Sequence, residues 1–239
     1  MEPEMAMTSR KKILDAPAYG LTEAAHLLTL PPPTLRSWVK GRPYTTAAGV
    51  RRSGPVIEAA DPTGRYLSFT NLVEAHVLSA VRRQHRVKFP HVRRAVEFLR
   101  RHYRSEHPLA DYQFETDGVD LFIDRLGGEL LNASRGGQIA VRDLIKMHLR
   151  RIERNPQGVP IRLFPFTHSQ PTREPKGPIV IDPELAFGRP SIRRIGVPTA
   201  IIAERYKAGE AVDELVDDYG ALREEIEEAL RCELPLNAA

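Results

Sequence analysis

The chain has 239 residues, of which 41% are hydrophobic and 28% charged, a composition typical of a globular protein. No run approaches the roughly 18 uninterrupted apolar residues needed to cross a membrane. The N-terminal segment MEPEMAMTSRKK also lacks the apolar core of a signal peptide, so we expect a cytoplasmic protein without membrane contact. The single cysteine, Cys232, excludes an intramolecular disulfide and a cysteine-cluster zinc site.

Charge is distributed unevenly along the chain. Residues 1–110 contain 18 Lys and Arg against 9 Asp and Glu, whereas residues 176–239 contain 8 against 13. The net charge of +4 therefore divides into a basic N-terminal part and an acidic C-terminal part, which predicts surfaces with different partners. A basic surface suits contact with a phosphate backbone, although such arginines can also simply solvate helix faces.

Two short helices separated by prolines are predicted near the N-terminus. Thr22 can cap a helix over Glu23–Leu30, and the run Pro31–Pro33 then breaks it. A second helix over Thr34–Lys40 ends at Gly41. This is the layout of a helix-turn-helix, although a purely structural helical hairpin gives the same pattern. The second helix offers four polar groups to bases and phosphates: Thr34, Arg36, Ser37 and Lys40.

A two-stranded wing is predicted after these helices. Pro55–Ala60 and Arg65–Phe69 have strand character and flank Asp61-Pro62-Thr63-Gly64, a turn sequence. The cations beside this wing that would contact phosphates are Arg51, Arg52 and Arg65. A long amphipathic helix is expected to follow over Asn71–Arg86.

The order of these elements resembles that of the MerR-like winged DNA-binding domains. The similarity covers about residues 19–86 and lies chiefly in LTEAAHLLTLPPPTLRSWV and YLSFTNLVEAHVL. It implies binding to operator DNA, and a helix-turn-helix that reads two half-sites implies a homodimer.

The middle of the chain is predicted to mix helices and strands. A helix is expected over Pro90–Tyr103, short strands separated by glycine turns over Asp111–Asn132, a helix over Val141–Arg154 and a strand over Pro160–Phe166. The polar, proline-containing stretch His168–Gly177 has the composition of a linker.

The C-terminal part is predicted to be a small helical module. A strand over Ile179–Ile181 precedes a helix that begins at Pro198 and ends at Gly209, and two more helices follow over Val212–Tyr219 and Leu222–Cys232. The stretch 178–232 resembles a small domain family of formally unknown function that occurs in bacterial antitoxins. The matching residues are Ile181, Asp182, Pro183, Gly188, Arg189, Pro190, Ile192, Arg193, Pro198 and Gly209. The sequence departs from the family at Arg194-Ile195-Gly196, where Gly-Thr-Arg is usual.

Together, the two similarities are those of a large VapB-type antitoxin. They imply a partner toxin of the PIN-domain ribonuclease type, which cuts RNA with Mg²⁺ held by carboxylates. The loop cations Arg189, Arg193 and Arg194 could present guanidinium groups to those carboxylates. They could also pair with the acidic residues of their own module, which are plentiful.

The fold class that these predictions describe is α+β and mainly helical. The expected organisation is a lead-in without regular structure over 1–17, the winged domain over 18–86, a mixed α/β region over 87–166, a linker over 167–177 and the helical module over 178–235.

No catalytic or metal-binding motif is present in the sequence. His85, His91 and His102 stand among arginines without zinc-ligand spacing, and no phosphate-loop or nucleophile-elbow pattern occurs. We therefore expect a protein that is not an enzyme and needs no cofactor. The alternative function is a ligand-responsive regulator without a toxin, whose middle region could form either a pocket or a plain core from Phe114, Leu121, Phe122 and Leu131.

Overall fold

The computed structural model describes residues 11–47, 49–82, 89–126, 135–167 and 176–234. These residues form two compact units: the first runs to residue 150 and includes 154–160, and the second comprises 151–153 and the residues from 161 onward. The fold is mixed α+β and mainly helical, and the described strands form four sheets of two strands each. None of the described helices is long and apolar enough to span a membrane.

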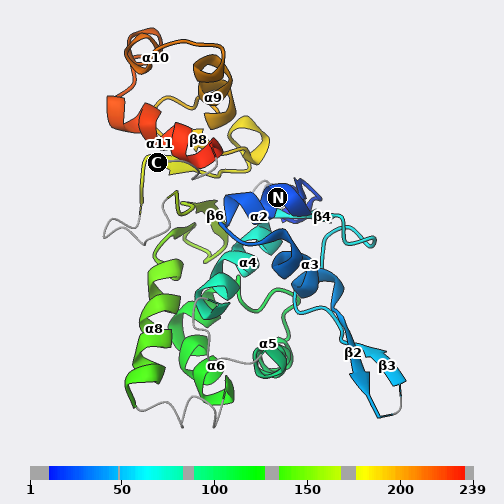
Figure 1. Cartoon of the computed structure of the whole chain (residues 1–239). Helices are drawn as coiled ribbons and strands as arrows, with labels where there is room; N and C mark the ends of the chain where they lie inside the picture. Colours follow the sequence, from blue (N-terminus) through cyan, green and yellow to red (C-terminus); the bar gives the residue numbers. More distant parts are fainter. Residues whose placement is uncertain (1–10, 48, 83–88, 127–134, 168–175, 235–239) are drawn as a thin grey trace. The chain divides into compact units, whose positions relative to one another are not determined.

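The first unit is built mainly of helices (Figure 1), and many of their apolar side chains are buried. Its helices are α2 (Leu21–Leu27), α3 (Pro32–Lys40), α4 (Phe69–Arg82), α5 (Phe89–Tyr103), α6 (Val119–Leu126) and α8 (Arg135–Leu149). Its strands are β1 (Tyr19–Gly20), β2 (Pro43–Thr46), β3 (Gly49–Arg52) and β4 (Tyr66–Leu67). Helix α4 lies at the centre of this unit, and its described side chains are buried along almost its whole length.

The predicted pair of short helices is confirmed, with shifted ends. Helix α2 is capped by Gly20, whose N–H donates to the carboxylate of Glu23 at 3.3 Å, so the prediction that Thr22 is the cap is wrong. The helix also ends before the predicted Leu30, because Thr29 adopts a left-handed conformation with φ of +51°. Pro31 then caps α3, whose first turn accommodates prolines because it needs no N–H donors there.

The hairpin of this unit is not the one predicted. Strands β2 and β3 pair antiparallel, with Tyr44 opposite Arg51, so the hairpin follows α3 directly. The predicted wing strands Pro55–Ala60 and Arg65–Phe69 do not pair: the first is not a strand, and β4 pairs instead with β1. The turn at Asp61–Gly64 does form, but it does not close a hairpin.

The backbone of Val56–Ala60 finds partners other than a neighbouring strand. The carbonyl of Trp38 accepts from the N–H groups of Val56 and Ile57, at 2.7 and 3.2 Å. The buried side chain of Asn71 donates to the carbonyl of Glu58 at 2.8 Å and accepts from the N–H of Ala60 at 2.9 Å. These bonds fix the segment against α3 and α4 without a β-ladder.

The region predicted as short strands over Asp111–Asn132 is helical where it is described. A π-helical turn, Phe114–Gly118, leads directly into α6. Phe114 and Phe122 are fully buried and contact each other edge-to-face with ring centroids 5.8 Å apart, while Leu121 is half-buried. The two phenylalanines therefore form core, not a pocket; Leu131 lies outside the described residues.

The chain then passes from the first unit to the second. The predicted helix over Val141–Arg154 is α8, but it ends at Leu149, and β5 (Ile152–Arg154) replaces its last residues. Strand β5 forms a two-stranded sheet with β6 (Pro160–Leu163), which confirms the predicted strand at that place with an earlier end.

The second unit packs three helices over a small sheet. Its elements are β7 (Ile179–Val180), a 3₁₀ turn (Ala186–Gly188), β8 (Ser191–Ile192), α9 (Thr199–Lys207), α10 (Val212–Tyr219) and α11 (Arg223–Glu233). Ile192, Ile202 and Ile226 are fully buried at its core. The three predicted helices and the predicted strand at 179 are confirmed to within two residues.

Candidate nucleic-acid interface

Helix α3 has one buried side and one polar side. Leu35 and Trp38 are buried, whereas Arg36 is exposed. The other predicted DNA-contacting residues of this helix, Thr34, Ser37 and Lys40, are half-buried. The hydroxyl of Ser37 donates to the carbonyl of Thr34 at 2.7 Å, so its proton is engaged and its oxygen remains an acceptor.

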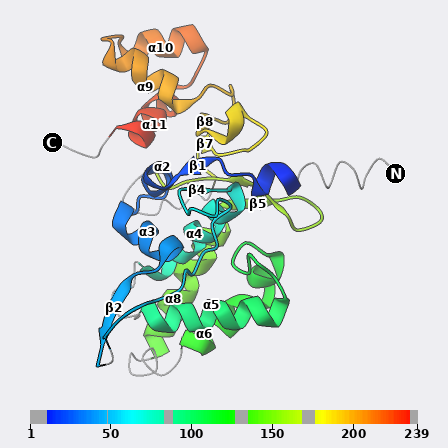
Figure 2. The ribbon, with the colours of Figure 1, turned by 90° about the vertical axis from the view of Figure 1, so that its right-hand side faces the viewer.

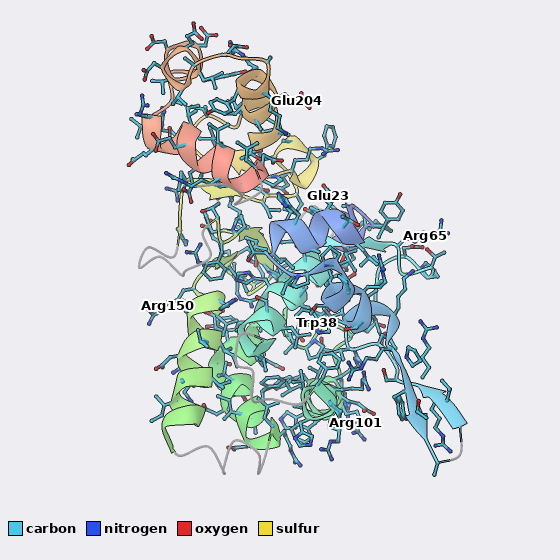
Figure 3. All side chains as sticks on the ribbon, viewed as in Figure 1. Glu23, Trp38, Arg65, Arg101, Arg150 and Glu204 are labelled. Carbon is cyan, nitrogen blue, oxygen red and sulfur yellow. The ribbon has the colours of Figure 1, made fainter. Side chains whose placement is uncertain are left out.

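Trp38 anchors α3 to the rest of the unit (Figure 3). Its indole ring stacks on Phe89 of α5, with centroids 6.3 Å apart and planes 7° from parallel. Its backbone carbonyl accepts hydrogen bonds from the N–H groups of Val56 and Ile57. Because both the side chain and the backbone of one residue are fixed, the polar side of α3 has a defined orientation.

A sharp bend joins α3 to the hairpin, and it requires glycine. Gly41 has a φ of +65°, and a Cβ there would lie 1.8 Å from the carbonyl oxygen of Ser53. Ser53 and Arg42 exchange hydrogen bonds across the base of the hairpin: the Ser53 N–H donates to the Arg42 carbonyl, and the Arg42 N–H donates to the Ser53 hydroxyl, both at 3.0 Å.

The β2–β3 hairpin is a projecting, cationic ribbon. Figures 1 and 2 show it extending away from the helices of its unit. All residues of β3 are exposed, including Arg51 and Arg52, so the structure places these two predicted phosphate contacts on the hairpin itself. Tyr44 and Val50 add exposed apolar surface, with 47% and 75% of their surface accessible.

Arg65 does not lie on this hairpin. It is exposed just before β4, and Figure 3 shows it apart from β2 and β3. The turn that precedes it is held by Asp61, whose carboxylate accepts from the hydroxyl of Thr63 and from the N–H of Arg65; these bonds lower the pKa of Asp61 to about 2. Gly64 in this turn faces Lys40, so the turn and Arg65 lie near the C-terminal end of α3.

Two exposed residues of this surface were missed by the sequence analysis. Arg42 and Tyr44 lie at the start of the hairpin. The guanidinium of Arg93 in α5 is 5.5 Å from the centroid of the Phe89 ring, and burial, together with the nearby charge of Arg42, lowers the pKa of Arg93. The signal for this hairpin in the sequence was the pair of short strand-like runs Tyr44-Thr45-Thr46 and Val50-Arg51-Arg52, which are separated by small residues.

A pocket of about 430 Å³ lies between α5 and α6. One face of α5, with residues three and four apart, supplies His91, Arg94, Glu97, Phe98 and Arg101, and α6 supplies Arg125 and Leu126. The guanidinium of Arg125 lies over the ring of Phe98 at 3.9 Å. Three arginines against one glutamate make the lining cationic.

The three loop cations predicted to face a toxin have different surroundings in the second unit. Arg194 is engaged within its own unit: its Nη2 donates to Glu225 and to the carbonyl of Gly220, both at 2.7 Å. Arg193 is exposed, with its guanidinium 5.8 Å from the centroid of the Phe164 ring. Arg189 is exposed and forms no ion pair with a described residue.

Groups of three or more His, Cys, Asp or Glu that could hold a metal ion are not found among the described residues. The expectation that the protein has no catalytic or metal site stays a prediction.

Residues 179–231 match a protein family described as "Protein of unknown function (DUF433)". Over 90% of its length, the chain is 29% identical to a Mycobacterium tuberculosis (strain ATCC 25618 / H37Rv) protein named "Putative antitoxin VapB45", of which the match covers 93%. It is also 25% identical to the "Uncharacterized protein Rv2308" of the same strain, over 96% of this chain and 94% of that protein.

The crystal structure of Rv2018 from Mycobacterium tuberculosis is similar to this structure. The TM-score is 0.66 at 24% sequence identity, over 90% of this chain and 98% of that one. At 24% identity this similarity shows a shared fold and gives no information on function. The match of residues 179–231 to a family of unknown function covers nearly all of the stretch 178–232, which was expected to be a small domain of formally unknown function.

Proposed function

We propose that the protein is an antitoxin that binds and neutralises a PIN-domain ribonuclease, and that its first unit binds the promoter DNA of its own operon. The observation that carries the DNA-binding part is the arrangement of α3 and the β2–β3 hairpin. An anchored helix with Arg36 exposed stands beside a projecting ribbon that carries Arg51 and Arg52. The antitoxin part rests on the similarity to the protein named VapB45.

In this proposal α2, α3 and the hairpin act as a winged helix-turn-helix. Helix α3 enters the major groove, where Arg36, Lys40 and the oxygen of Ser37 meet base edges and phosphates. The hairpin lies along the backbone, where Arg51 and Arg52 neutralise phosphates. Because one such module covers one half-site, the protein binds its operator as a homodimer. It has no catalytic activity of its own in this account.

Co-purification tests the proposal. The chain is expressed with a tag, together with the reading frame next to its own. We expect a stable complex whose partner shows Mg²⁺-dependent ribonuclease activity only after separation from this chain. A lone dimer that still shifts its own promoter DNA would reject the antitoxin part and leave a transcriptional regulator.

The pocket between α5 and α6 supports a second candidate, a regulator that responds to an anionic ligand. Its cationic lining suits a multiply charged anion. Inorganic pyrophosphate, titrated calorimetrically into the whole protein, is a suitable probe. Binding that is lost in Arg125→Ala, together with a changed affinity for promoter DNA, would favour this candidate; no heat of binding would count against it.

A further inference from the structure

Phe187 is the most exposed large hydrophobic residue in the described part of the chain. Its side chain lies in the loop between β7 and β8 and is 94% accessible. Single exposed apolar residues are common at protein surfaces and need no explanation by themselves. Phe187 differs from them because its backbone is held in an unfavourable conformation.

Two consecutive residues of this loop are left-handed without being glycine. Ala186 has a φ of +49°, and Phe187 has φ of +57° and ψ of +34°. In this region the Cβ of an L-residue approaches its own backbone closely, so alanine and phenylalanine are disfavoured there and glycine is not. This backbone conformation disfavours a phenylalanine, and the ring, which is 94% accessible, gains no compensating burial against the described residues.

The loop is fixed at both ends. At its start, the N–H of Leu185 donates to the carbonyl of Asp182 at 2.9 Å, and the carboxylate of Asp182 is held by Arg162 at 2.7 Å. At its end, the carbonyl of Pro190 accepts from the N–H of the buried Thr199 at 2.9 Å. The ring is therefore presented on a rigid support, so little conformational entropy is lost when a partner covers it.

The charges around the ring favour an acidic partner surface. Arg189 follows two residues after Phe187, is exposed and forms no ion pair with a described residue. Arg193 is also exposed. Glu184 is an exposed acid of the loop, and Asp182 is paired with Arg162. A rigid aromatic ring with an arginine beside it has the composition of the residues that dominate binding energy in protein interfaces.

We infer that residues 186–189 form the part of this protein that inserts into its partner protein, with Phe187 filling an apolar pocket and Arg189 meeting carboxylates at its rim. This inference rests on the proposed function, because the partner it names is the ribonuclease. Of the three loop arginines predicted to face the toxin, Arg194 takes no part in this contact, since its guanidinium is already engaged by Glu225 and Gly220.

The test measures the affinity of the whole protein for the separated ribonuclease by calorimetry, for the wild type, Phe187→Ser and Phe187→Gly. We expect both variants to bind at least about 10-fold more weakly, the loss typical of a central interface residue. Tyr206→Ser, at a tyrosine of the same unit that is 41% accessible, is the matched control and should bind as the wild type does.

Two further measurements separate binding from folding. Phe187→Gly should melt at the same or a higher temperature than the wild type, because glycine tolerates the left-handed conformation. All variants should keep their affinity for promoter DNA. Weakened binding in a variant that melts no lower and still binds DNA cannot come from unfolding.

Three results would overturn the inference. Equal ribonuclease binding by the wild type and both Phe187 variants would reject it while leaving the proposed function intact. A wild-type dimer that becomes monomeric in Phe187→Ser, with ribonuclease binding unchanged, would assign the loop to self-association instead. A wild type that binds no ribonuclease would reject the proposed function and this inference with it.

Discussion

Arg194 and Glu225 form a bidentate ion pair inside the second unit. The Nε and Nη2 atoms of Arg194 donate to the two carboxylate oxygens of Glu225, at 3.1 and 2.7 Å. The same carboxylate accepts from the N–H of Leu222 at 2.8 Å and so also caps α11. The pair ties the loop after β8 to the start of the last helix, which gives Arg194 a structural role.

Arg194→Ala should therefore lower the melting temperature of the second unit. Arg194 and the Leu222 N–H both lower the pKa of Glu225, and a lowered folded-state pKa contributes stability at pH values above the ordinary 4.5. That contribution disappears as the pH falls through the folded-state pKa. Thermal melts from pH 7 to pH 3 should show a smaller fall in melting temperature for Arg194→Ala than for the wild type. Identical pH profiles would contradict this role.

Asn71 is expected to be essential for the stability of the first unit. Its fully buried side chain bonds the carbonyl of Glu58 and the N–H of Ala60, and it also accepts from the N–H of Ser68 at 3.2 Å. Asn71→Leu leaves these groups without partners, at a cost of about 1–3 kcal/mol for each that stays buried, so we expect a loss of about 3–5 kcal/mol. Urea denaturation measures it, with the exposed Gln113→Leu as control. A loss below about 1 kcal/mol would refute this account.

His107 makes the first unit sensitive to pH. Burial opposes the charge of its ring, but a 2.9 Å bond from Nδ1 to the buried Glu74 carboxylate outweighs this and raises the pKa of His107 above its usual 6.5. Burial acts in the opposite direction on the carboxyl group of Glu74, whose pKa it raises. Both groups hold protons more tightly in the folded state, so the stability that they contribute is present at low pH and is lost as the pH rises through their folded-state pKa values.

His107→Gln should remove the part of this dependence that lies above pH 6.5. Urea denaturation at pH 6 and pH 8 measures it, with His102→Gln, an exposed histidine of α5, as the control. The wild type and the control should be less stable at pH 8 than at pH 6, and the His107 variant should show a smaller difference. An unchanged difference would show that His107 is not the titrating group.

DNA binding should depend on both α3 and the hairpin. The double changes Arg36→Ala with Lys40→Ala, and Arg51→Ala with Arg52→Ala, should each weaken promoter binding. Each lost phosphate contact should also reduce the slope of log K against log salt by about 0.9. Arg150→Ala is the matched control, because this exposed arginine of the same unit points away from α3 in Figure 3. Unchanged affinity at matched salt would exclude the changed residues as DNA contacts.

The sequence was sufficient to predict helices that begin and end at strong local signals. The prolines at the start of α3 and Gly209 after α9 are such signals, and both helices are found within two residues of their predicted ends. Local signals were insufficient where the outcome depended on distant partners. Val56–Ala60 has strand-like residues, but Trp38 and Asn71 satisfy its backbone, and no local pattern indicates those contacts.

The candidate sites show the same distinction. The polar side of α3 with Arg36 was expected from the sequence, whereas Arg51 and Arg52 were expected beside a different hairpin and lie on β3 itself. The engagement of Arg194 by Glu225, 31 positions away in the chain, did not. The exposure of Phe187 also could not be predicted, because phenylalanine is among the residue types most often buried.

The most direct test of the antitoxin proposal is a titration of RNA cleavage. The protein encoded next to this chain is purified apart from it, shown to cut RNA in the presence of Mg²⁺, and mixed with increasing amounts of this chain. We predict that cleavage falls in proportion to the added chain and ceases at a fixed molar ratio. Cleavage that continues undiminished in molar excess of this chain would contradict the proposal.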